Sequence, residues 1–392
     1  MPRALKGQFG RIASRSFVSR AVLLGGLSAL AACQVIPKGP PAPPPPPRET
    51  GPSESELPTD QARHRVALLV PLSGANAAVG QAVANAATMA ILDTGAKDIR
   101  ITTYDTSGGA GGAARRAVAD GNKLILGPLV SDDVVSVAQV ARPAHIPMIT
   151  YSNDVGVAAH DVFVLGSAPA QSVSRVVSYA KAAGVHRVAA LIPNGTYGQR
   201  ASAALVGTAR DIGLALGGVE SYDRGNTSII SAARRLGANY DGVLVAEGGR
   251  LSALAAPQLS RRAHVLGTSL WAGDAALTRS VALRGAWFAA LSDARWPRFE
   301  TSYKTRFGGL PPRLATMGYD SVLLTINVAR GWRPGTTFPT AKLYDAGGFV
   351  GLDGPFRFRG DGIAERAMEV REIGAGSTRV VSPAPARFSD GG

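Results

Sequence analysis

Short apolar runs of strand type alternate with helical patterns along most of this chain. The first run is VALLV, residues 66–70, and residues 76–93 then read as a helix with one apolar face. Further strand-like runs are predicted at 99–104, 123–126, 146–150, 162–165, 187–192, 217–222, 241–246, 263–266 and 286–290. Strands that alternate with helices predict an α/β fold with parallel sheets covered on both faces.

Sheets of this kind bind ligands in the crevice beyond the carboxyl ends of their strands, so the loops after the strands are candidate binding segments. Four loops carry small or hydroxyl side chains and backbone N–H groups before a helix, a geometry that suits an anion. The candidates there are Ser73, Gly74, Gly127, Pro128, Ser131, Tyr151, Ser152 and Tyr197. Taken singly, each loop is better explained by turn chemistry with a helix cap, such as Ser131 or Asp132, than by ligand binding.

The N-terminal segment has the pattern of an export signal. Residues 1–20 carry five basic residues and no acid, and residues 21–32 carry no charge. This uncharged run is shorter than the roughly 20 residues that span a membrane. Residues 30–33, LAAC, resemble the lipobox of bacterial lipoproteins, which makes Cys33 the expected lipidation site and mature N-terminus. The alternative is a free or buried cysteine, and as the only cysteine it forms no internal disulfide.

A proline-rich stretch follows Cys33. Residues 34–63 contain ten prolines, a composition typical of an extended spacer. At about 3.1 Å per residue it reaches up to ~90 Å. Gln34 is not the Asp that tends to retain lipoproteins at the inner membrane, so we expect a lipid anchor in the outer membrane that faces the periplasm.

Composition and motifs exclude several classes of protein. The formal charge is +14, but the arginines are scattered and aromatic residues make up only 6%, which argues against nucleic acid binding. The chain has no G-x-S-x-G elbow, P-loop or H-E-x-x-H motif, and its five histidines are far apart. We therefore expect no enzymatic activity, no cofactor and no metal site.

Read in order, the loops resemble a family. PLSG, then LGPLVSDDVVSVAQVARPAHIPMITYSND, LIPNGTYGQ and SIISAARRLGANYDGVLVAEGG follow the plan of type I periplasmic binding proteins of the leucine/isoleucine/valine-binding kind. Within that superfamily the chain is most similar to penicillin-binding protein activators, which are lipoproteins. Residues 349–373 resemble the C-terminal hairpin region of the superfamily, with a bend at 351–354 and a turn at 360–362.

The resemblance implies two lobes joined by a hinge of three crossovers, which we expect at 166–169, 267–270 and 331–335. The expected boundaries are a signal peptide at 1–32, the lipidated spacer at 33–63, lobe one at 64–168 plus 270–332, lobe two at 169–269 plus 333–384, and a tail at 385–392.

The resemblance also implies ligand residues. Amino-acid binders of this family hold the α-carboxylate with lobe-one loops, here Ser131, Tyr151 and Ser152, and the ammonium group with a tyrosine and an acid of lobe two, here Tyr197 and Glu247. The chain departs from this pattern at Asp154, whose carboxylate would oppose that of a ligand.

Two functions are compatible with these features. The first is an activator of a peptidoglycan synthase, favoured by the long spacer and the activator-like segments. The second is the substrate-binding subunit of an ABC importer, partnered by a permease, for branched-chain amino acids or a related small molecule; the placement of Tyr197 and Glu247 supports it.

Overall fold

The computed structural model describes residues 63–225 and 227–388, which belong to one compact unit, Leu57–Gly392. The predicted signal peptide, Cys33 and the proline-rich spacer lie outside the described residues. No helix of the described part is long and apolar enough to cross a membrane.

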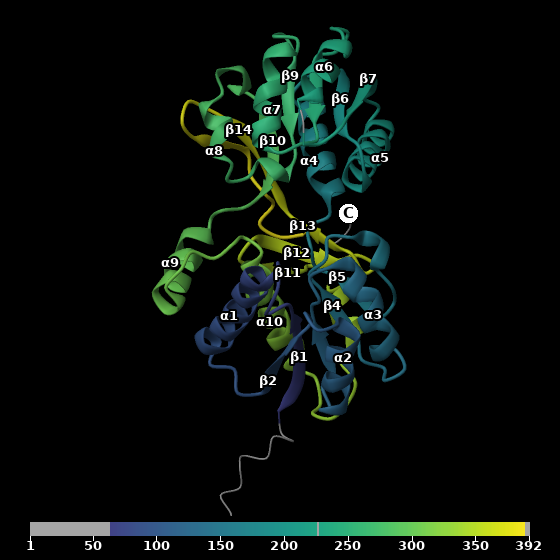
Figure 1. The fold of residues 1–392 in the computed structure, drawn as a ribbon, viewed down its shortest axis with the longest axis vertical. Coiled ribbons are helices and arrows are strands. Elements are labelled where there is room, and N and C mark those ends of the chain that lie inside the picture. The colour runs from purple at the N-terminus through teal and green to yellow at the C-terminus, as the bar shows by residue number, and fades with distance from the viewer. Residues whose placement is uncertain (1–62, 226, 389–392) are drawn as a thin grey trace, which may run out of the picture. The chain divides into compact units, whose positions relative to one another are not determined.

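A five-stranded parallel sheet of order β2-β1-β3-β4-β5 forms the centre of lobe one (Figure 1). In β1, Val66 and Leu68 face the cluster formed with α1 and α10, whereas Ala67 and Leu69 face α2 and α3. Both faces are covered, which explains the uninterrupted apolar run. The elements are β1 (His64–Val70), α1 (Ala77–Thr94), β2 (Ile99–Asp105), α2 (Ala110–Ala119), β3 (Leu124–Leu126), α3 (Ser131–Ala141), β4 (Met148–Thr150), η1 (Val155–Val157) and β5 (Val162–Val164).

Lobe two is built on a seven-stranded sheet of order β15-β14-β10-β9-β8-β6-β7, parallel except where β14 pairs with β10 and β15. Helices α4 and α5 cover one face, and α6 and α7 cover the other. The elements are α4 (Pro169–Ala182), β6 (Arg187–Pro193), α5 (Thr196–Asp211), β7 (Ala215–Tyr222), α6 (Ser228–Arg235), β8 (Gly242–Val245), α7 (Gly249–Ala255), η2 (Ala256–Gln258), β9 (His264–Gly267), η3 (Ser269–Trp271), α8 (Ala275–Arg279), η4 (Val281–Leu283), β10 (Trp287–Leu291), β14 (Met368–Ile373) and β15 (Thr378–Ser382).

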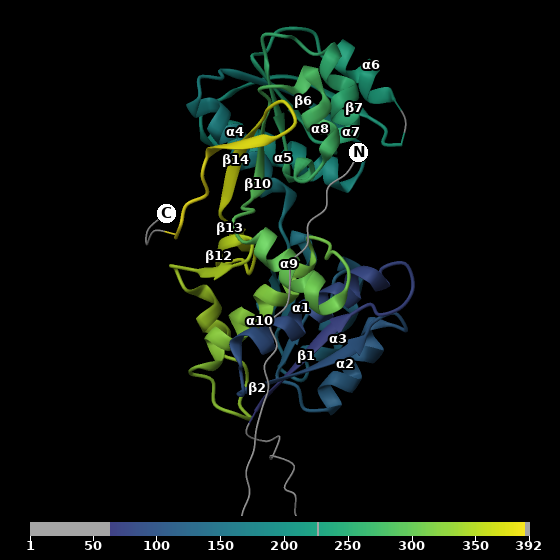
Figure 2. The same cartoon turned by 90° about the vertical axis from the view of Figure 1, so that its left-hand side faces the viewer.

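The chain between β10 and β14 returns to lobe one. Helix α10 packs against α1, and a small antiparallel sheet of order β11-β12-β13 adds Phe349, Phe356 and Phe358 to the lobe-one core. Figure 2 shows the yellow strands β12 and β13 in lobe one and β14 in lobe two. The elements are α9 (Trp296–Phe307), α10 (Ala315–Ala329), η5 (Thr340–Tyr344), β11 (Phe349–Gly351), β12 (Gly354–Phe358) and β13 (Ala364–Arg366).

The predicted α/β architecture with parallel sheets is confirmed, and each predicted strand from 66–70 to 286–290 corresponds to one of β1 to β10. The expected C-terminal hairpins are confirmed as well. Gly351 pairs with Gly354 across the bend between β11 and β12, and β12 pairs with β13 across the second turn.

Two of the three predicted crossovers are placed differently by the structure. The chain passes between the sheets after β5, after β10 and between β13 and β14. Residues 267–270 are no crossover, because β10 pairs with β9 in the same sheet. Residues 331–335 are none either, because the segment that follows them packs in the lobe-one core through Phe338 and Phe349. Residues 270–291 therefore belong to lobe two, and 333–366 belong to lobe one.

Candidate functional site

The loop after β1 is tied to the end of β2. The backbone N–H of Leu72 donates to Asp105 Oδ1 at 2.8 Å, and the backbone N–H of Ser73 donates to Ser107 Oγ at 3.1 Å. Donation from Leu72 and Ser107 lowers the pKa of the Asp105 carboxyl. Ser73 is exposed, and Gly74 turns the chain with a φ of 72°. These two candidates therefore lie in the exposed loop at the carboxyl end of β1.

The loop after β3 depends on Gly127. Its φ is 91°, and a Cβ at this position would clash with the carbonyl oxygen of Leu69. The Gly127–Pro128 peptide bond is cis, and the Pro128 carbonyl oxygen accepts a hydrogen bond from Thr150 Oγ1 at 2.7 Å. Ser131 is half-buried and is the first residue of α3, where neither it nor Asp132 caps the helix by a side-chain hydrogen bond.

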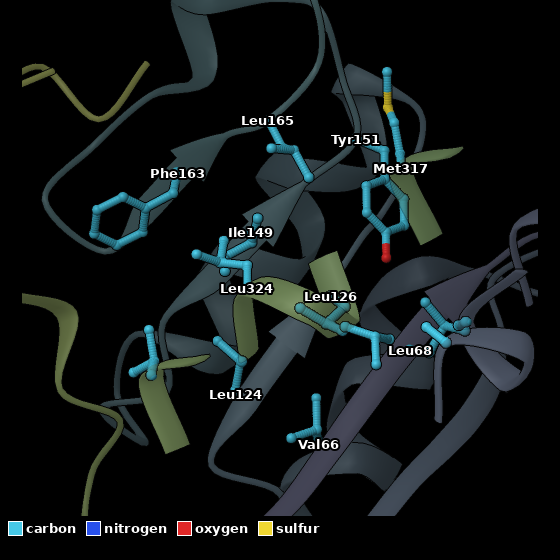
Figure 3. Close-up of a cluster of buried hydrophobic side chains, with 14 of the residues drawn as sticks. Val66, Leu68, Leu124, Leu126, Ile149, Tyr151, Phe163, Leu165, Met317 and Leu324 are labelled. Carbon is cyan, nitrogen blue, oxygen red and sulfur yellow. The ribbon is translucent and has the colours of Figure 1, made fainter. Parts of the chain in front are cut away.

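The structure places the side chain of Tyr151, a predicted ligand residue, in the core of lobe one. Only 2% of Tyr151 is exposed, and its hydroxyl lies 2.9 Å from Ser321 Oγ of α10. Figure 3 shows its side chain within the lobe-one cluster, together with Ile149 and Met317. Burial raises the pKa of the Tyr151 hydroxyl. Ile149 stands two residues earlier in β4, and side chains two apart in a strand share a face, so this pattern could have indicated the core position.

Ser152 has a local role in the loop after β4. It is buried, its backbone N–H donates to Thr150 Oγ1 at 3.1 Å, and its hydroxyl accepts a hydrogen bond from the backbone N–H of Asp154 at 3.1 Å. Both bonds are typical of a polar turn. The hydroxyl of Ser152 therefore shapes the loop that presents Asp154.

In lobe two the structure brings Tyr197 and Glu247 together through Arg224. The Arg224 guanidinium lies 4.9 Å from the centre of the Tyr197 ring, and its Nε donates to Glu247 Oε2 at 3.0 Å. The Tyr197 hydroxyl in turn lies 2.9 Å from Thr268 Oγ1. Burial raises the pKa of the Tyr197 hydroxyl.

The Glu247 carboxylate has further partners. The Tyr222 hydroxyl donates to Oε2 at 3.0 Å, and the backbone N–H of Gly248 donates to Oε1 at 2.8 Å. Glu247 is buried, with 7% of its surface exposed. A buried carboxylate is stable only with such partners, and here a cation and two donors of the chain itself supply them.

Asp154 and Arg200 connect the two lobes. Arg200 of α5 donates to Asp154 Oδ1 at 2.6 Å, and the same oxygen accepts the backbone N–H of Gly156 at 2.8 Å. Burial alone would raise the pKa of Asp154, but Arg200 and Gly156 outweigh it and lower the pKa. The carboxylate that departs from the amino-acid pattern is therefore neutralised from the opposite lobe.

A cavity of about 380 Å³ lies at the second crossover and is lined by both lobes. Asp293 forms ion pairs there with Arg313 of lobe one and Arg371 of β14. Trp296, Leu314 and Met317 supply much of its remaining lining. The charges of the cavity are thus matched within the chain.

Sequence reasoning missed Arg200, Arg224 and Thr268. Arg200 lies eight residues beyond the predicted strand that precedes it, and Arg224 and Thr268 lie two residues beyond theirs. A search for cations in the segments after these strands could therefore have found the two arginines. The described residues contain no group of three or more His, Cys, Asp or Glu that could hold a metal ion.

Two lobes, each a mainly parallel sheet between helices, with three crossovers and with facing polar loops, define the class of type I periplasmic binding proteins. The chain belongs to the periplasmic binding protein family, whose model matches residues 64–378. The resemblance inferred from the sequence is therefore confirmed.

Solved structures with this fold include binding proteins and a regulator. A branched-chain amino acid ABC transporter periplasmic ligand-binding protein from Burkholderia xenovorans is 17% identical, with a TM-score of 0.66. The match covers 83% of this chain and 96% of that protein's chain. The C-domain of LpoA from Haemophilus influenzae, a regulator of PBP1A, is 18% identical with a TM-score of 0.65, covering 81% and 99%. At such identities the similarity establishes the fold.

Among curated proteins, the uncharacterized protein RP748 of Rickettsia prowazekii is 30% identical over 186 residues. The match covers 46% of this chain and 49% of that protein, about half of its length.

Proposed function

We propose that the protein is a non-enzymatic activator of a peptidoglycan synthase, a penicillin-binding protein, in the cell envelope. The pairing of Glu247 with Arg224 carries this proposal. An amino acid bound in the manner of this family needs a carboxylate for its ammonium group. Here the Arg224 guanidinium occupies the place that the ammonium group would take beside Glu247. Displacing the guanidinium from Glu247 would leave it unpaired beside the Tyr197 ring.

The lobe-one side supports the same conclusion. Tyr151 faces the core, and Ser152 is engaged in its own loop. The salt bridge between Asp154 and Arg200 joins the lobes without a ligand carboxylate. A protein that regulates through its surface does not require a polar cleft that takes up an amino acid.

The N-terminal segment fits an activator held at a distance from its partner. We propose that Cys33 is the lipidation site, that the anchor lies in the outer membrane, and that residues 34–63 are the spacer. The fold shared with LpoA, a regulator of PBP1A, is consistent with this role.

The second candidate is the binding subunit of an ABC importer. The cavity of about 380 Å³ that both lobes line favours it, since that volume suits a small molecule. The charge-matched walls of the cavity indicate a neutral, partly apolar ligand rather than a free amino acid.

A thermal-shift panel tests the amino-acid version of the importer. We expect no amino acid at millimolar concentration to raise the melting temperature of residues 57–392, although a ligand at 100 times its Kd adds about 2.7 kcal/mol. The same panel is measured on Arg224→Ala, which frees the Glu247 carboxylate, and on the control Arg250→Ala, which changes an exposed side chain of α7. A shift in the wild type that Glu247→Ala removes would support the importer instead.

The partner is tested by a pull-down from envelope extract with residues 57–392 as bait. The activator proposal expects enrichment of a peptidoglycan synthase. Enrichment of an importer permease with no synthase would contradict it.

A further inference from the structure

The amino ends of β9 and β10 border a second pocket, in lobe two, with a volume of about 620 Å³. Arg261, Arg262, Arg284 and His264 line it, and its lining includes no Asp or Glu. Because the parallel strands run away from this end, the pocket lies at the opposite end of the sheet from Tyr197 and Glu247 (β9 and β10 are labelled in Figure 1). It is therefore separate from the site between the lobes.

The three arginines are exposed, and their guanidinium groups form no hydrogen bond or ion pair with the part of the chain that the structure describes. Two arginines elsewhere in lobe two differ. Arg235 pairs with Glu220 at 2.8 Å, and Arg371 pairs with Glu369 at 2.6 Å. The cations of the pocket thus remain available to a ligand.

Asp241 and Glu372, the acids next to neighbouring strands, find their hydrogen-bond partners outside the pocket lining. Asp241 accepts hydrogen bonds from the backbone N–H groups of His186 and Arg187 at 2.9 and 2.7 Å. Glu372 accepts from the Trp287 indole at 3.1 Å and pairs with Arg379 at 2.7 Å. The lining itself carries three arginines and no carboxylate, so its net charge is positive.

We infer that this pocket binds a phosphate-bearing anion of headgroup or sugar-phosphate size. The planar guanidinium fork matches phosphate oxygens in pairs, and three such groups suit a ligand with two or more negative charges. The volume exceeds that of inorganic phosphate alone. Pro257 and Val281, the latter 70% exposed, give the rim an apolar part that suits the carbon portion of such a ligand.

Calorimetry with pyrophosphate tests the inference. Residues 57–392 serve as the protein, because every buried cluster lies within that unit and the acyl anchor is absent from it. We expect Arg261→Ala/Arg262→Ala/Arg284→Ala to weaken pyrophosphate binding at least tenfold. The matched triple Arg115→Ala/Arg298→Ala/Arg333→Ala removes three exposed arginines of lobe one and is expected to keep the affinity within twofold.

Vesicles separate the two sources of phosphate. Binding to phosphatidylglycerol but not phosphatidylcholine vesicles, lost in the pocket triple, assigns the phosphate to a lipid headgroup. Pyrophosphate binding without vesicle binding assigns it to a soluble molecule.

A lysine variant guards against misfolding of the alanine triple. Arg261→Lys/Arg262→Lys/Arg284→Lys keeps the charge but loses the fork, and we expect it to bind severalfold more weakly than the wild type. The inference is overturned if neither probe binds the wild type. It is also overturned if the lobe-one triple loses as much affinity as the pocket triple, because net charge alone would then explain binding.

Discussion

Asp320 of α10 is 1% exposed, and its Oδ2 atom has no hydrogen-bond partner among the described residues. Its Oδ1 atom accepts the backbone N–H of Leu352 at 2.7 Å. Burial, and then the nearby charge of Asp353, raise the pKa of Asp320 to about 7. The folded state thus holds this proton more tightly than the unfolded chain does, so between about pH 4 and 7 the folded protein loses stability as the pH rises.

Asp320→Asn should flatten that dependence, since the amide is neutral at every pH. Urea unfolding at pH 5 and at pH 8 gives the free energy of unfolding of both proteins at each pH. We expect the wild type to lose on the order of 2–4 kcal/mol more than the variant between the two values, at about 1.4 kcal/mol per pKa unit. An equal loss in both proteins would contradict the raised pKa.

The Tyr151 hydroxyl forms its hydrogen bond within the core of lobe one. Ser321 Oγ donates to the Gly318 carbonyl oxygen at 3.1 Å, so the Tyr151 hydroxyl is the donor in its bond to Ser321. Tyr151→Phe should lower the free energy of unfolding by about 1 kcal/mol. Tyr344→Phe is the control, because Tyr344 is 38% exposed, and it should change stability by less than about 0.5 kcal/mol. Equal effects in the two variants would argue against a core role.

At the scale of elements, the contact between α1 and α10 depends on one glycine. A Cβ on Gly318 would clash with the Val83 carbonyl oxygen, whereas a Cβ on Gly207 of α5 would meet nothing within 4 Å. Gly318→Ala should therefore destabilise the protein by about 1–3 kcal/mol. Gly207→Ala should stabilise it by up to about 1 kcal/mol. The melting temperatures of both variants are compared with that of the wild type. A higher melting temperature for Gly318→Ala would refute the close approach of Gly318 to the Val83 carbonyl oxygen.

The strands were predictable from the sequence because burial on both faces of a sheet requires a continuous run of apolar residues. Val66 and Leu68 pack on one face of the sheet and Ala67 and Leu69 on the other, so the whole run is apolar. The candidate site was only partly predictable. Tyr197 and Glu247 follow strands whose ends meet, but their link is Arg224, whose position depends on the loop after β7 and leaves no periodic signal.

At the scale of the whole molecule, the sequence indicated two lobes but misplaced two crossovers. The crossovers were predicted from glycines, but a glycine can also be required where a neighbouring side chain leaves no room for a Cβ. Gly267 lacks a side chain because the Trp271 ring occupies that space, not because the chain leaves the sheet there. The crossover after β10 instead contains Asp293 between Arg313 and Arg371, residues that are far apart in the sequence and therefore leave no local signal of this contact.

We propose that this protein activates a peptidoglycan synthase and does not take up an amino acid. In the most direct test, a protein of residues 57–392 is added to a purified bifunctional peptidoglycan synthase from the same bacterium. The rate at which the synthase polymerises a lipid-linked precursor is then measured. We expect a rate at least twofold above that of the synthase alone, unchanged by added amino acids. An unchanged synthase rate, together with an amino acid that raises the melting temperature of the same protein, would contradict it.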